Sequence, residues 1–559
     1  PVPSTGRYKL TITYSSGKQP DDWSYFNSSR LSSIARKTGN KNYNVLVCDL
    51  ISGKPIQGAT VKIYRKSDDK HIQEVTVKSD NQGIVVIKNI PNNRFYQVTL
   101  NEDNQGMIVP LPSQYFSSSK PIVKETSLFT DRAIYRPGQI VYFSGISWEA
   151  TAEASKAVTG KKYTVTLSDV NNQVVAKEEV QTNEFGSFAG KFTLPQDVLN
   201  GLFFITAGEA NHTITVAEYK RPKFEITFNP IKGAYKAGDR LTVSGIAKNY
   251  SCANAGNSKV TYSIQSRSFA WRFQENTIAA GKTQTNEKGE FSVSFDTEKT
   301  TDNSPGALYR NFVTYTVSVT VTTPNGETQE SNYSVQVTPQ NYRLNSSVYP
   351  YMNKEKPNSI TVTTLNYNEY PLTENITYEL SALKPLQKLG EEYDRSNLPV
   401  DKKVLEGTFT TNTDKALELN LSSLPSGAYL LKLSGTGDNS NITNENIIYL
   451  YSPQDKRPPY LTYFWSVEEK TTCIPGEDAR ILLGSSAKDV YVLYEIYSDQ
   501  KLMERKRLVL NNSNTTLDIP YKEDFGKKAE VIVSFIKDGE FFTNNFMLTR
   551  EEADKKLDI

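Results

Sequence analysis

The stretch Tyr-Arg-Pro-Gly-Gln-Ile-Val-Tyr-Phe-Ser-Gly-Ile, residues 135–146, decides the fold because the chain repeats it. Tyr-Lys-Ala-Gly-Asp-Arg-Leu-Thr-Val-Ser-Gly-Ile follows at 235–246, an offset of 100 residues at every matched position. A second motif, Thr-Asn-Glu-Phe-Gly-Ser-Phe at 182–188, returns at 285–291 and more loosely at 79–84, with an offset of 103 both times. Two motifs that repeat in the same order at nearly one interval indicate a tandem array of similar domains.

Both motifs contain turn chemistry. Pro137-Gly138 suits a type II turn, because proline presets φ at one central position and glycine supplies positive φ at the next. Asn-Glu-X-Gly precedes an alternating run, so we expect Gly186 and Gly289 to lie at equivalent hairpins. Matched turns fix matched registers. Residues 125–222 and 223–340 are therefore predicted to be two copies of one antiparallel sandwich.

Strong alternation of apolar and polar residues recurs along the chain, for example at residues 8–14, 315–321 and 529–535. A period of two with β-branched and aromatic residues is typical of half-buried antiparallel strands. No long segment has a helical stripe, apart from a short polar stretch at 551–556. The sequence predicts an all-β chain built from sandwiches of roughly 100 residues.

Length and charge exclude several classes of protein. A chain of 559 residues exceeds a single core, and about four to six domains are expected. The 64 Lys and Arg residues balance 62 Asp and Glu residues without a concentrated basic run, which disfavours nucleic acid as a partner. No run approaches the roughly eighteen apolar residues of a membrane span. The chain opens at Pro1 without a signal peptide, and we interpret it as a fragment whose targeting signal lies upstream.

Three cysteines, Cys48, Cys252 and Cys473, fall in three different inferred domains. A disulfide within one domain is therefore not expected, and a disulfide-rich secreted domain is disfavoured. Cys48 lies in the strand predicted at 43–50, where we expect it to act as a small buried hydrophobe.

Residues 130–139, Thr-Asp-Arg-Ala-Ile-Tyr-Arg-Pro-Gly-Gln, resemble the signature that opens a macroglobulin-like domain of the alpha-2-macroglobulin family, in the style of its bacterial, Bacteroidetes-like branch. Segments at 216–225, 457–459 and 473–479 resemble later domain boundaries of that family in the same order. The resemblance implies seven-stranded, immunoglobulin- or fibronectin-like macroglobulin-type sandwiches. The signature residues, which we expect to be structural, are Asp131, Arg132, Tyr135, Pro137 and Gly138.

The resemblance also implies a function. Family members are extracytoplasmic and trap proteinases, and many bind the attacker through an internal Cys-Gly-Glu-Gln thioester. None of the three cysteines here begins that motif, so we expect the thioester and its helical domain to lie downstream or to be missing. The implied partners are proteinases and other domains of the same full-length chain. The implied location is the periplasm or the outer cell envelope, with any lipid anchor in an upstream segment.

The same marks predict the domain boundaries. Residues 1–27 look like the closing strands of a preceding domain, and macroglobulin-like sandwiches follow at 28–124, 125–222, 223–340, 341–455 and 456–559.

Catalytic and metal chemistry is not expected. His71 and His212 lie in different inferred domains, so a two- or three-histidine metal site cannot form within one domain. A catalytic triad would need one of these two residues, and we expect both to be ordinary surface histidines. Glu391-Glu392 are adjacent and point to opposite faces of an extended chain, which does not make an acid/base pair. We predict no catalytic residue, no thioester, no metal and no cofactor.

Two stretches carry weaker functional hypotheses. The polar insertion at 384–399 lacks strand alternation, and we expect a protease-sensitive loop that could serve as bait or could be an ordinary long loop. The aromatic row Phe269, Trp271 and Phe273 could face a ligand, an interdomain contact or a core. The candidate cleavage residues are Lys384, Lys388, Arg395, Lys402 and Lys403.

The leading hypothesis is the scaffold portion of a proteinase inhibitor at the cell envelope, which is not an enzyme. An extracytoplasmic adhesin or polysaccharide- or protein-binding array of similar sandwiches is the alternative, because a fold does not fix a function. An enzyme with accessory sandwiches is the third hypothesis. A downstream thioester motif would favour the inhibitor, and further sandwiches ending in an anchor would favour the adhesin.

Overall fold

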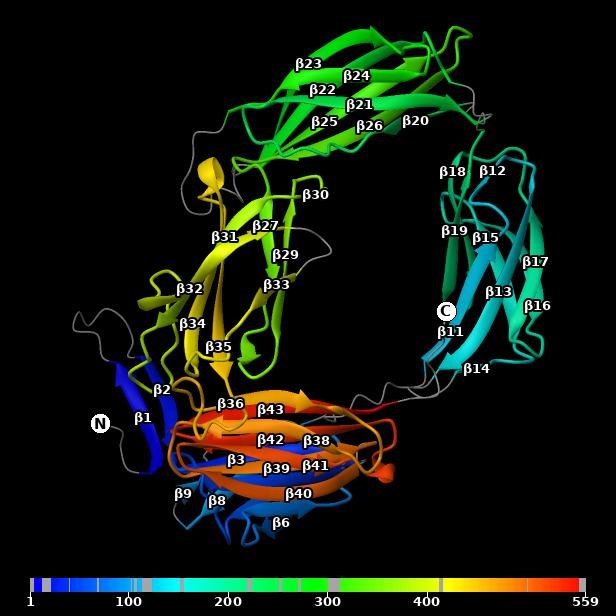
Figure 1. Cartoon of the computed structure of the whole chain (residues 1–559). Helices are drawn as coiled ribbons and strands as arrows, with labels where there is room; N and C mark the ends of the chain where they lie inside the picture. Colours follow the sequence, from blue (N-terminus) through cyan, green and yellow to red (C-terminus); the bar gives the residue numbers. More distant parts are fainter. Residues whose placement is uncertain are drawn as a thin grey trace. The chain divides into compact units, whose positions relative to one another are not determined.

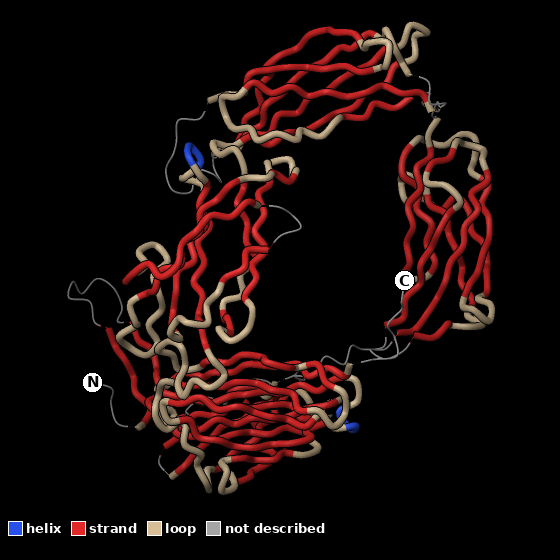
Figure 2. Tube along the Cα trace, viewed as in Figure 1, coloured by secondary structure: helices blue, strands red, loops and turns tan. Residues whose placement is uncertain are grey.

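The computed structural model describes residues 5–12, 22–39, 41–67, 70–101, 103–104, 108–112, 123–150, 155–218, 224–250, 254–269, 273–299, 312–411, 416–499 and 501–551 (Figure 1). Strands dominate these residues, and the only helical pieces among them are two short 3-10 turns, Gly437–Asn439 and Glu523–Phe525 (Figure 2). The prediction of an all-β fold is confirmed. The 551–556 stretch lies almost wholly outside the described residues.

In the described part of the chain, five large hydrophobic cores follow one another, and each lies between two sheets. We call the corresponding units the first to fifth sandwich. Their cores span residues 31–111, 128–216, 224–337, 342–450 and 473–548. Residues 117–222 form one compact unit, and residues 1–116 and 223–559 together form another.

The second sandwich contains the quoted 135–146 stretch. Alternate residues of that stretch, such as Val141 and Phe143, are buried between the sheets. Its two sheets consist of β11 (Val123–Thr130), β13 (Ile140–Ala150), β14 (Ser155–Ala157) and β17 (Ser187–Thr193), and of β12 (Ile134–Tyr135), β19 (Ala210–Val216), β18 (Gly201–Ala207), β15 (Lys162–Ser168) and β16 (Val174–Gln181).

The third sandwich has the same plan as the second, except that its sheets contain no counterparts of the short strands β12 and β14 among the described residues. Three strands face four, which is the predicted seven-stranded arrangement. Its sheets are β20 (Phe224–Phe228), β21 (Arg240–Asn249) and β24 (Glu290–Asp296), and β23 (Phe273–Gln284), β22 (Lys259–Phe269), β25 (Val313–Thr322) and β26 (Thr328–Val337).

The repeated glycines occupy matching positions. Gly138 and Gly238 have φ of 80° and 92°, and each turn is closed by a backbone bond from the next residue: Gln139 N donates to Arg136 O at 3.2 Å, and Asp239 N donates to Lys236 O at 3.1 Å. Each turn precedes the second long strand of its sandwich, β13 or β21. The predicted equivalence of these two turns is confirmed.

Gly186 and Gly289 are also equivalent, with φ of 73° and 79°. In each case an asparagine Oδ1 three residues earlier, of Asn183 or Asn286, accepts two backbone N–H bonds. The expectation of a hairpin was wrong, however. β16 and β17 belong to opposite sheets, as do β23 and β24, so each turn carries the chain across the core. The turn chemistry was predictable, but strand pairing depends on distant residues.

The remaining sandwiches use the same arrangement of two sheets. Before the first sandwich, β1 (Gly6–Ile12) and β2 (Asp22–Ser28) pair antiparallel. The first sandwich comprises β3 (Leu31–Gly39), β4 (Asn42–Asp49) and β7 (Ile84–Ile87) against β5 (Thr60–Ser67), β6 (Lys70–Lys78), β8 (Arg94–Leu100), β9 (Asp103–Asn104) and β10 (Val109–Pro110).

The fourth and fifth sandwiches end the described chain. The fourth comprises β27 (Arg343–Ser347), β29 (Asn358–Leu365), β30 (Pro371–Leu372) and β33 (Ala416–Leu419) against β28 (Tyr351–Asn353), β35 (Thr443–Tyr451), β34 (Gly427–Gly435), β31 (Asn375–Leu383) and β32 (Val400–Thr410). The fifth comprises β36 (Trp465–Lys470), β38 (Asp478–Ser485) and β41 (Ser513–Pro520) against β37 (Thr472–Cys473), β43 (Glu540–Arg550), β42 (Lys528–Lys537), β39 (Val490–Ser498) and β40 (Lys501–Leu510).

Candidate functional site

The signature residues form a hydrogen-bonded lock at the entrance to β12. Tyr135 Oη donates to Asp131 Oδ1 at 2.6 Å and accepts from Arg132 N at 2.9 Å. Tyr142 N of β13 donates to the same Asp131 oxygen at 3.1 Å. The Tyr135 side chain is fully buried in the second core. One carboxylate therefore fixes a buried tyrosine, its own turn and the neighbouring strand.

These bonds determine the ionisation of Asp131. Desolvation opposes its charge, but the bonds from Tyr135 and Tyr142 outweigh this effect and hold the pKa of Asp131 below its ordinary value. The charged carboxylate is thus the form that the folded state prefers. The third sandwich retains the tyrosine as Tyr235 but has Pro230-Ile231-Lys232 where the second has Thr-Asp-Arg. Tyr235 Oη has no hydrogen-bond partner among the described residues.

We expect acid to weaken the second sandwich through this lock. Because the folded pKa of Asp131 is lowered, its stabilisation is present above the unfolded pKa of about 4 and is lost as pH falls through the folded value. Asp131→Asn, which lacks the titrating group, should show a smaller loss of stability in acid than the wild type. Urea unfolding followed by hydrogen exchange of peptides from 123–216 at several pH values measures this. Equal acid sensitivity in both proteins would contradict the role of Asp131.

The candidate cleavage residues lie in and beside the connection from β31 to β32. Lys384, Lys388 and Arg395 are exposed in the 384–399 segment. Lys402 and Lys403 are also exposed but belong to β32, and Lys403 forms ion pairs with Glu379 at 3.0 Å and Glu406 at 2.8 Å. A proteinase needs backbone that is not held in a β-sheet. Of these candidate residues, those in 384–399 lie outside the strands.

The aromatic row falls at the tip of the β22–β23 hairpin. Phe269 ends β22 and Phe273 begins β23, and the two are register partners. Trp271 lies outside the described residues, so the ligand and interface hypotheses for this row stay open.

The two histidines lie in different surroundings. His71 is exposed on β6, with its ring 5.1 Å from that of Phe95. His212 Nε2 lies 3.0 Å from Thr130 Oγ1 within the second sandwich. Cys48 and Cys473 are free and buried, and burial raises the pKa of the Cys48 thiol to about 12. The described residues contain no group of three His, Cys, Asp or Glu side chains placed to hold a metal.

A buried charge cluster, which sequence reasoning missed, joins the first sandwich to the fifth. Arg36 of β3 forms an ion pair with Glu495 of β39, and its Nη2 donates to Ser534 Oγ at 2.6 Å. Arg505 of β40 also pairs with Glu495, at 2.7 Å. The side chains of Arg36 and Glu495 are only 5% and 2% exposed. An apolar cluster of Leu46, Ile84, Leu493 and Ile34 packs beside these charges.

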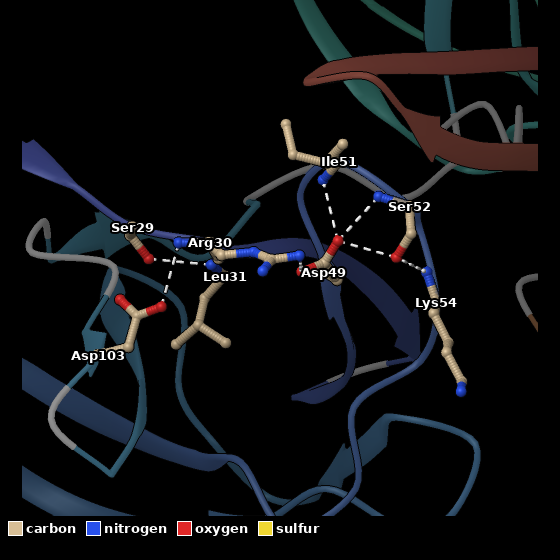
Figure 3. Close-up of polar contacts among 8 residues, drawn as sticks. All are labelled: Ser29, Arg30, Leu31, Asp49, Ile51, Ser52, Lys54 and Asp103. Atoms are coloured by element: carbon tan, nitrogen blue, oxygen red, sulfur yellow. Dashed lines mark hydrogen bonds and ion pairs between the residues drawn. The ribbon is translucent and has the colours of Figure 1, made fainter. Parts of the chain in front are cut away.

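A backbone contact extends this junction. Asp538 N donates to Ile51 O at 2.8 Å and Gly539 N donates to Leu50 O at 3.0 Å. The preceding Asp49 carboxylate shapes the turn that presents these carbonyls (Figure 3). Its Oδ1 accepts from Ser52 N and Ser52 Oγ, both at 2.8 Å, and its Oδ2 pairs with Arg30 at 2.9 Å.

The sequence carried a signal for this junction. Residues 490–497, Val-Tyr-Val-Leu-Tyr-Glu-Ile-Tyr, form a nearly continuous apolar run instead of an alternating one. Such runs are typical of strands that are buried on both faces, and β39 and β4 are buried along almost their whole length. A lone glutamate within the run needs a cationic partner, but only the fold shows that one of the two partners of Glu495 is 459 residues away.

Comparisons with known proteins agree with this architecture. The sequence model of the MG2 domain matches residues 125–228, which contain the lock. An alpha-2-macroglobulin of Thermotoga maritima is 23% identical over 351 residues, which is 61% of this chain and 21% of that protein. Trypsin-activated alpha-2-macroglobulin from Escherichia coli aligns with a TM-score of 0.51 at 14% identity, over 98% of this chain and 39% of that chain. The native E. coli protein aligns with a TM-score of 0.43, 14% identity, and coverage of 99% and 37%.

The chain thus contains an MG2 domain and shares the fold of alpha-2-macroglobulin sandwiches, and it spans about a fifth of the length of the curated relative it matches. Among the described residues, no helix has the length and apolar character needed to cross a membrane.

Proposed function

We propose that this chain is the scaffold portion of a bacterial alpha-2-macroglobulin-like proteinase inhibitor of the Bacteroidetes-like branch. It is not an enzyme in this proposal, and its partners are attacking proteinases and other domains of the same protein. The protein acts outside the cytoplasm, in the periplasm or the outer cell envelope.

The observation that carries this proposal is the Asp131–Tyr135 lock inside the segment that matches the MG2 domain. The sequence match supports the class of domain. The hydrogen bonds of the lock explain why the signature contains Asp131 and Tyr135. The array of sandwiches around it supports a scaffold rather than a catalyst, because the buried Tyr135, Arg36 and Glu495 hold strands or sandwiches together.

The proposed domains follow the cores. We infer macroglobulin-like sandwiches at 28–124, 125–222, 223–340, 341–455 and 456–559, with residues 1–27 closing a preceding domain. The five cores fall inside these five ranges, and the β1–β2 hairpin falls inside the first 28 residues. Expression of 125–222 alone, followed by two-state unfolding, tests the most separable of these boundaries.

Trapping is tested with the full-length protein. A proteinase that is enclosed by a large scaffold loses access to protein substrates but keeps access to a short peptide. We therefore expect incubation to inhibit cleavage of a folded protein substrate while hydrolysis of a chromogenic peptide continues. Equal loss of both activities would indicate an ordinary active-site inhibitor, and no loss of either would refute the proposed function.

We expect limited proteolysis by an enzyme that cuts after Lys or Arg to nick the 384–403 region first, at Lys388 or Arg395. Both side chains are exposed, and the backbone there is largely unpaired. Mass mapping of the first fragments measures this. Lys388→Gln combined with Arg395→Gln is the matched variant and should delay the first cut. First cuts near Arg221 or Arg457 instead would show that the segment is too well packed to be sensitive.

A further inference from the structure

Three hydroxyl groups from the two sheets of the second sandwich meet at one end of its core. They belong to Thr126 of β11, Ser147 of β13 and Tyr163 of β15. Each of the three oxygens, Thr126 Oγ1, Ser147 Oγ and Tyr163 Oη, lies 2.9 Å from the other two. Ser147 and Tyr163 are buried, and Thr126 is half-buried. We call this group the hydroxyl triangle.

The repeated fold does not require these hydroxyls, because the third sandwich has apolar side chains at the three equivalent positions, Ile226, Ala247 and Val260. Ile226 is the register partner of Ala247, as Thr126 is of Ser147. Val260, like the tyrosine of the triangle, lies two residues beyond a backbone N–H that donates to a buried threonine Oγ1. Burying hydroxyls costs free energy unless all of them are bonded. The demands of the fold therefore do not explain the triangle.

Lys161 polarises the triangle. Its Nζ lies 4.6 Å from the centre of the Tyr163 ring. Burial opposes ionisation of Tyr163, but bonds from Ser147 and Thr126, together with the Lys161 ammonium, outweigh burial and hold the pKa of Tyr163 below its ordinary value. With Ser147 and Thr126 as donors to Tyr163, the phenolic hydrogen is left for an acceptor outside the triangle.

A cavity of about 370 Å³ opens at the hydroxyl triangle. β11, β13, the start of β15 and the turn between β18 and β19 form its walls, so the cavity belongs entirely to the second sandwich. Its volume is in the range of small-molecule sites in proteins. Besides the triangle, the lining contains five side chains able to contact a ligand, Glu125, Trp148, Glu149, Lys161 and Glu209.

The charged groups of the lining have both signs. Glu149 is already paired with Lys156 at 3.5 Å. The ammonium of Lys161 offsets one of the other two carboxylates, Glu125 and Glu209. The cavity thus has no strong excess of either charge, which favours a ligand without a net charge.

Hydrogen bonding defines the ligand further. Carboxylates only accept, whereas the Lys161 ammonium only donates. A matching ligand must present donors and acceptors close together, as hydroxyl groups do, since each both donates and accepts. Trp148 adds an aromatic surface on which apolar C–H groups can pack. A saccharide ring carries both kinds of surface.

We propose that the cavity beside the hydroxyl triangle binds one neutral saccharide unit, either a free sugar or the end of a glycan chain. Lys161 and Tyr163 donate to sugar oxygens. Glu125 and Glu209 accept from sugar hydroxyls, and Trp148 packs against the C–H groups of the ring. The site does not depend on the trapping of proteinases.

Saturation-transfer NMR on the full chain tests the site with D-glucose, D-galactose, D-mannose and N-acetyl-D-glucosamine, and with linear oligosaccharides of the same units. We expect saturation to reach at least one of these sugars. Equal binding of a monosaccharide and its oligosaccharide would support a free sugar, and tighter binding of the oligosaccharide would support a glycan chain. Transfer to none of the sugars would overturn the proposal, as would binding of glycine alone, which would indicate a site for a zwitterion.

Variants locate the bound sugar. Ser147→Ala introduces the residue of the third sandwich and removes a donor that orients the Tyr163 hydroxyl, so it should weaken binding about tenfold. Ser144→Ala, at an exposed position of the same strand, is the matched control and should bind like the wild type. Glu209→Ala changes the exposed rim and should weaken binding by a similar factor without altering the core. Unchanged affinity in both Ser147→Ala and Glu209→Ala would place the sugar elsewhere and overturn the proposal.

Discussion

Replacement of Glu495 by alanine is expected to weaken the junction between the first and fifth sandwiches by about 3–5 kcal/mol, because it leaves the buried guanidinium of Arg36 and the half-buried one of Arg505 without their carboxylate. Arg36 and Arg505 both pair with Glu495, and the pair with Arg36 is almost completely shielded from solvent. The variant can avoid this cost only by separating the two sandwiches, which exposes Leu46 and Leu493. Hydrogen exchange of peptides from 42–49 and 490–498 should therefore rise.

Two controls separate charge from packing. Asp518→Ala removes an exposed ion pair with Arg480 in the same sandwich, and it should leave the exchange of both peptides unchanged. A triple variant that replaces Arg36 by Met, Glu495 by Leu and Arg505 by Met substitutes apolar groups for the whole cluster and should restore the junction. If Glu495→Ala exchanges like the wild type, the cluster does not hold the sandwiches together.

The contrast between turns and junctions shows what the sequence could reveal. The equivalence of Gly138 with Gly238 was predictable because positive φ is a local demand that only a few residues satisfy. The period of two was likewise enough for an all-β fold. The crossing of the chain between sheets at Gly186 was not predictable, because the turn is the same whether the next strand pairs with its predecessor or with β13.

For the candidate sites, too, the sequence identified some residues but not the contacts that they make. The signature gave Asp131 and Tyr135 as structural residues. Their hydrogen bond forms only in the folded connection between β11 and β12, which belong to opposite sheets. The pair of Arg36 and Glu495 depends on two sandwiches far apart in the chain.

Valine at Gly186 is expected to destabilise the second sandwich by about 2–5 kcal/mol, through a strained positive φ and a steric overlap. A Cβ there would collide with the carbonyl oxygen of Ser147, and that oxygen cannot move freely because it accepts from Val158 N at 2.9 Å. Gly138→Val is the milder comparison, since its Cβ would meet only the flexible side chain of Gln196 at 3.3 Å. Its cost should be limited to the φ strain of about 1–3 kcal/mol.

The equivalent glycine of the third sandwich, Gly289, allows a test of whether the sandwiches unfold independently. A Cβ at Gly289 would meet the carbonyl oxygen of Ala247 just as one at Gly186 meets that of Ser147, and Gly83 faces Val47 in the same way. Gly289→Val should therefore destabilise the third sandwich by a similar amount and leave the second intact, while Gly186→Val should do the reverse. Hydrogen exchange resolved by peptide in urea distinguishes the sandwiches, which share no core. If either variant weakened both sandwiches equally, the two would unfold as one cooperative unit, and the independence of the repeats would be wrong.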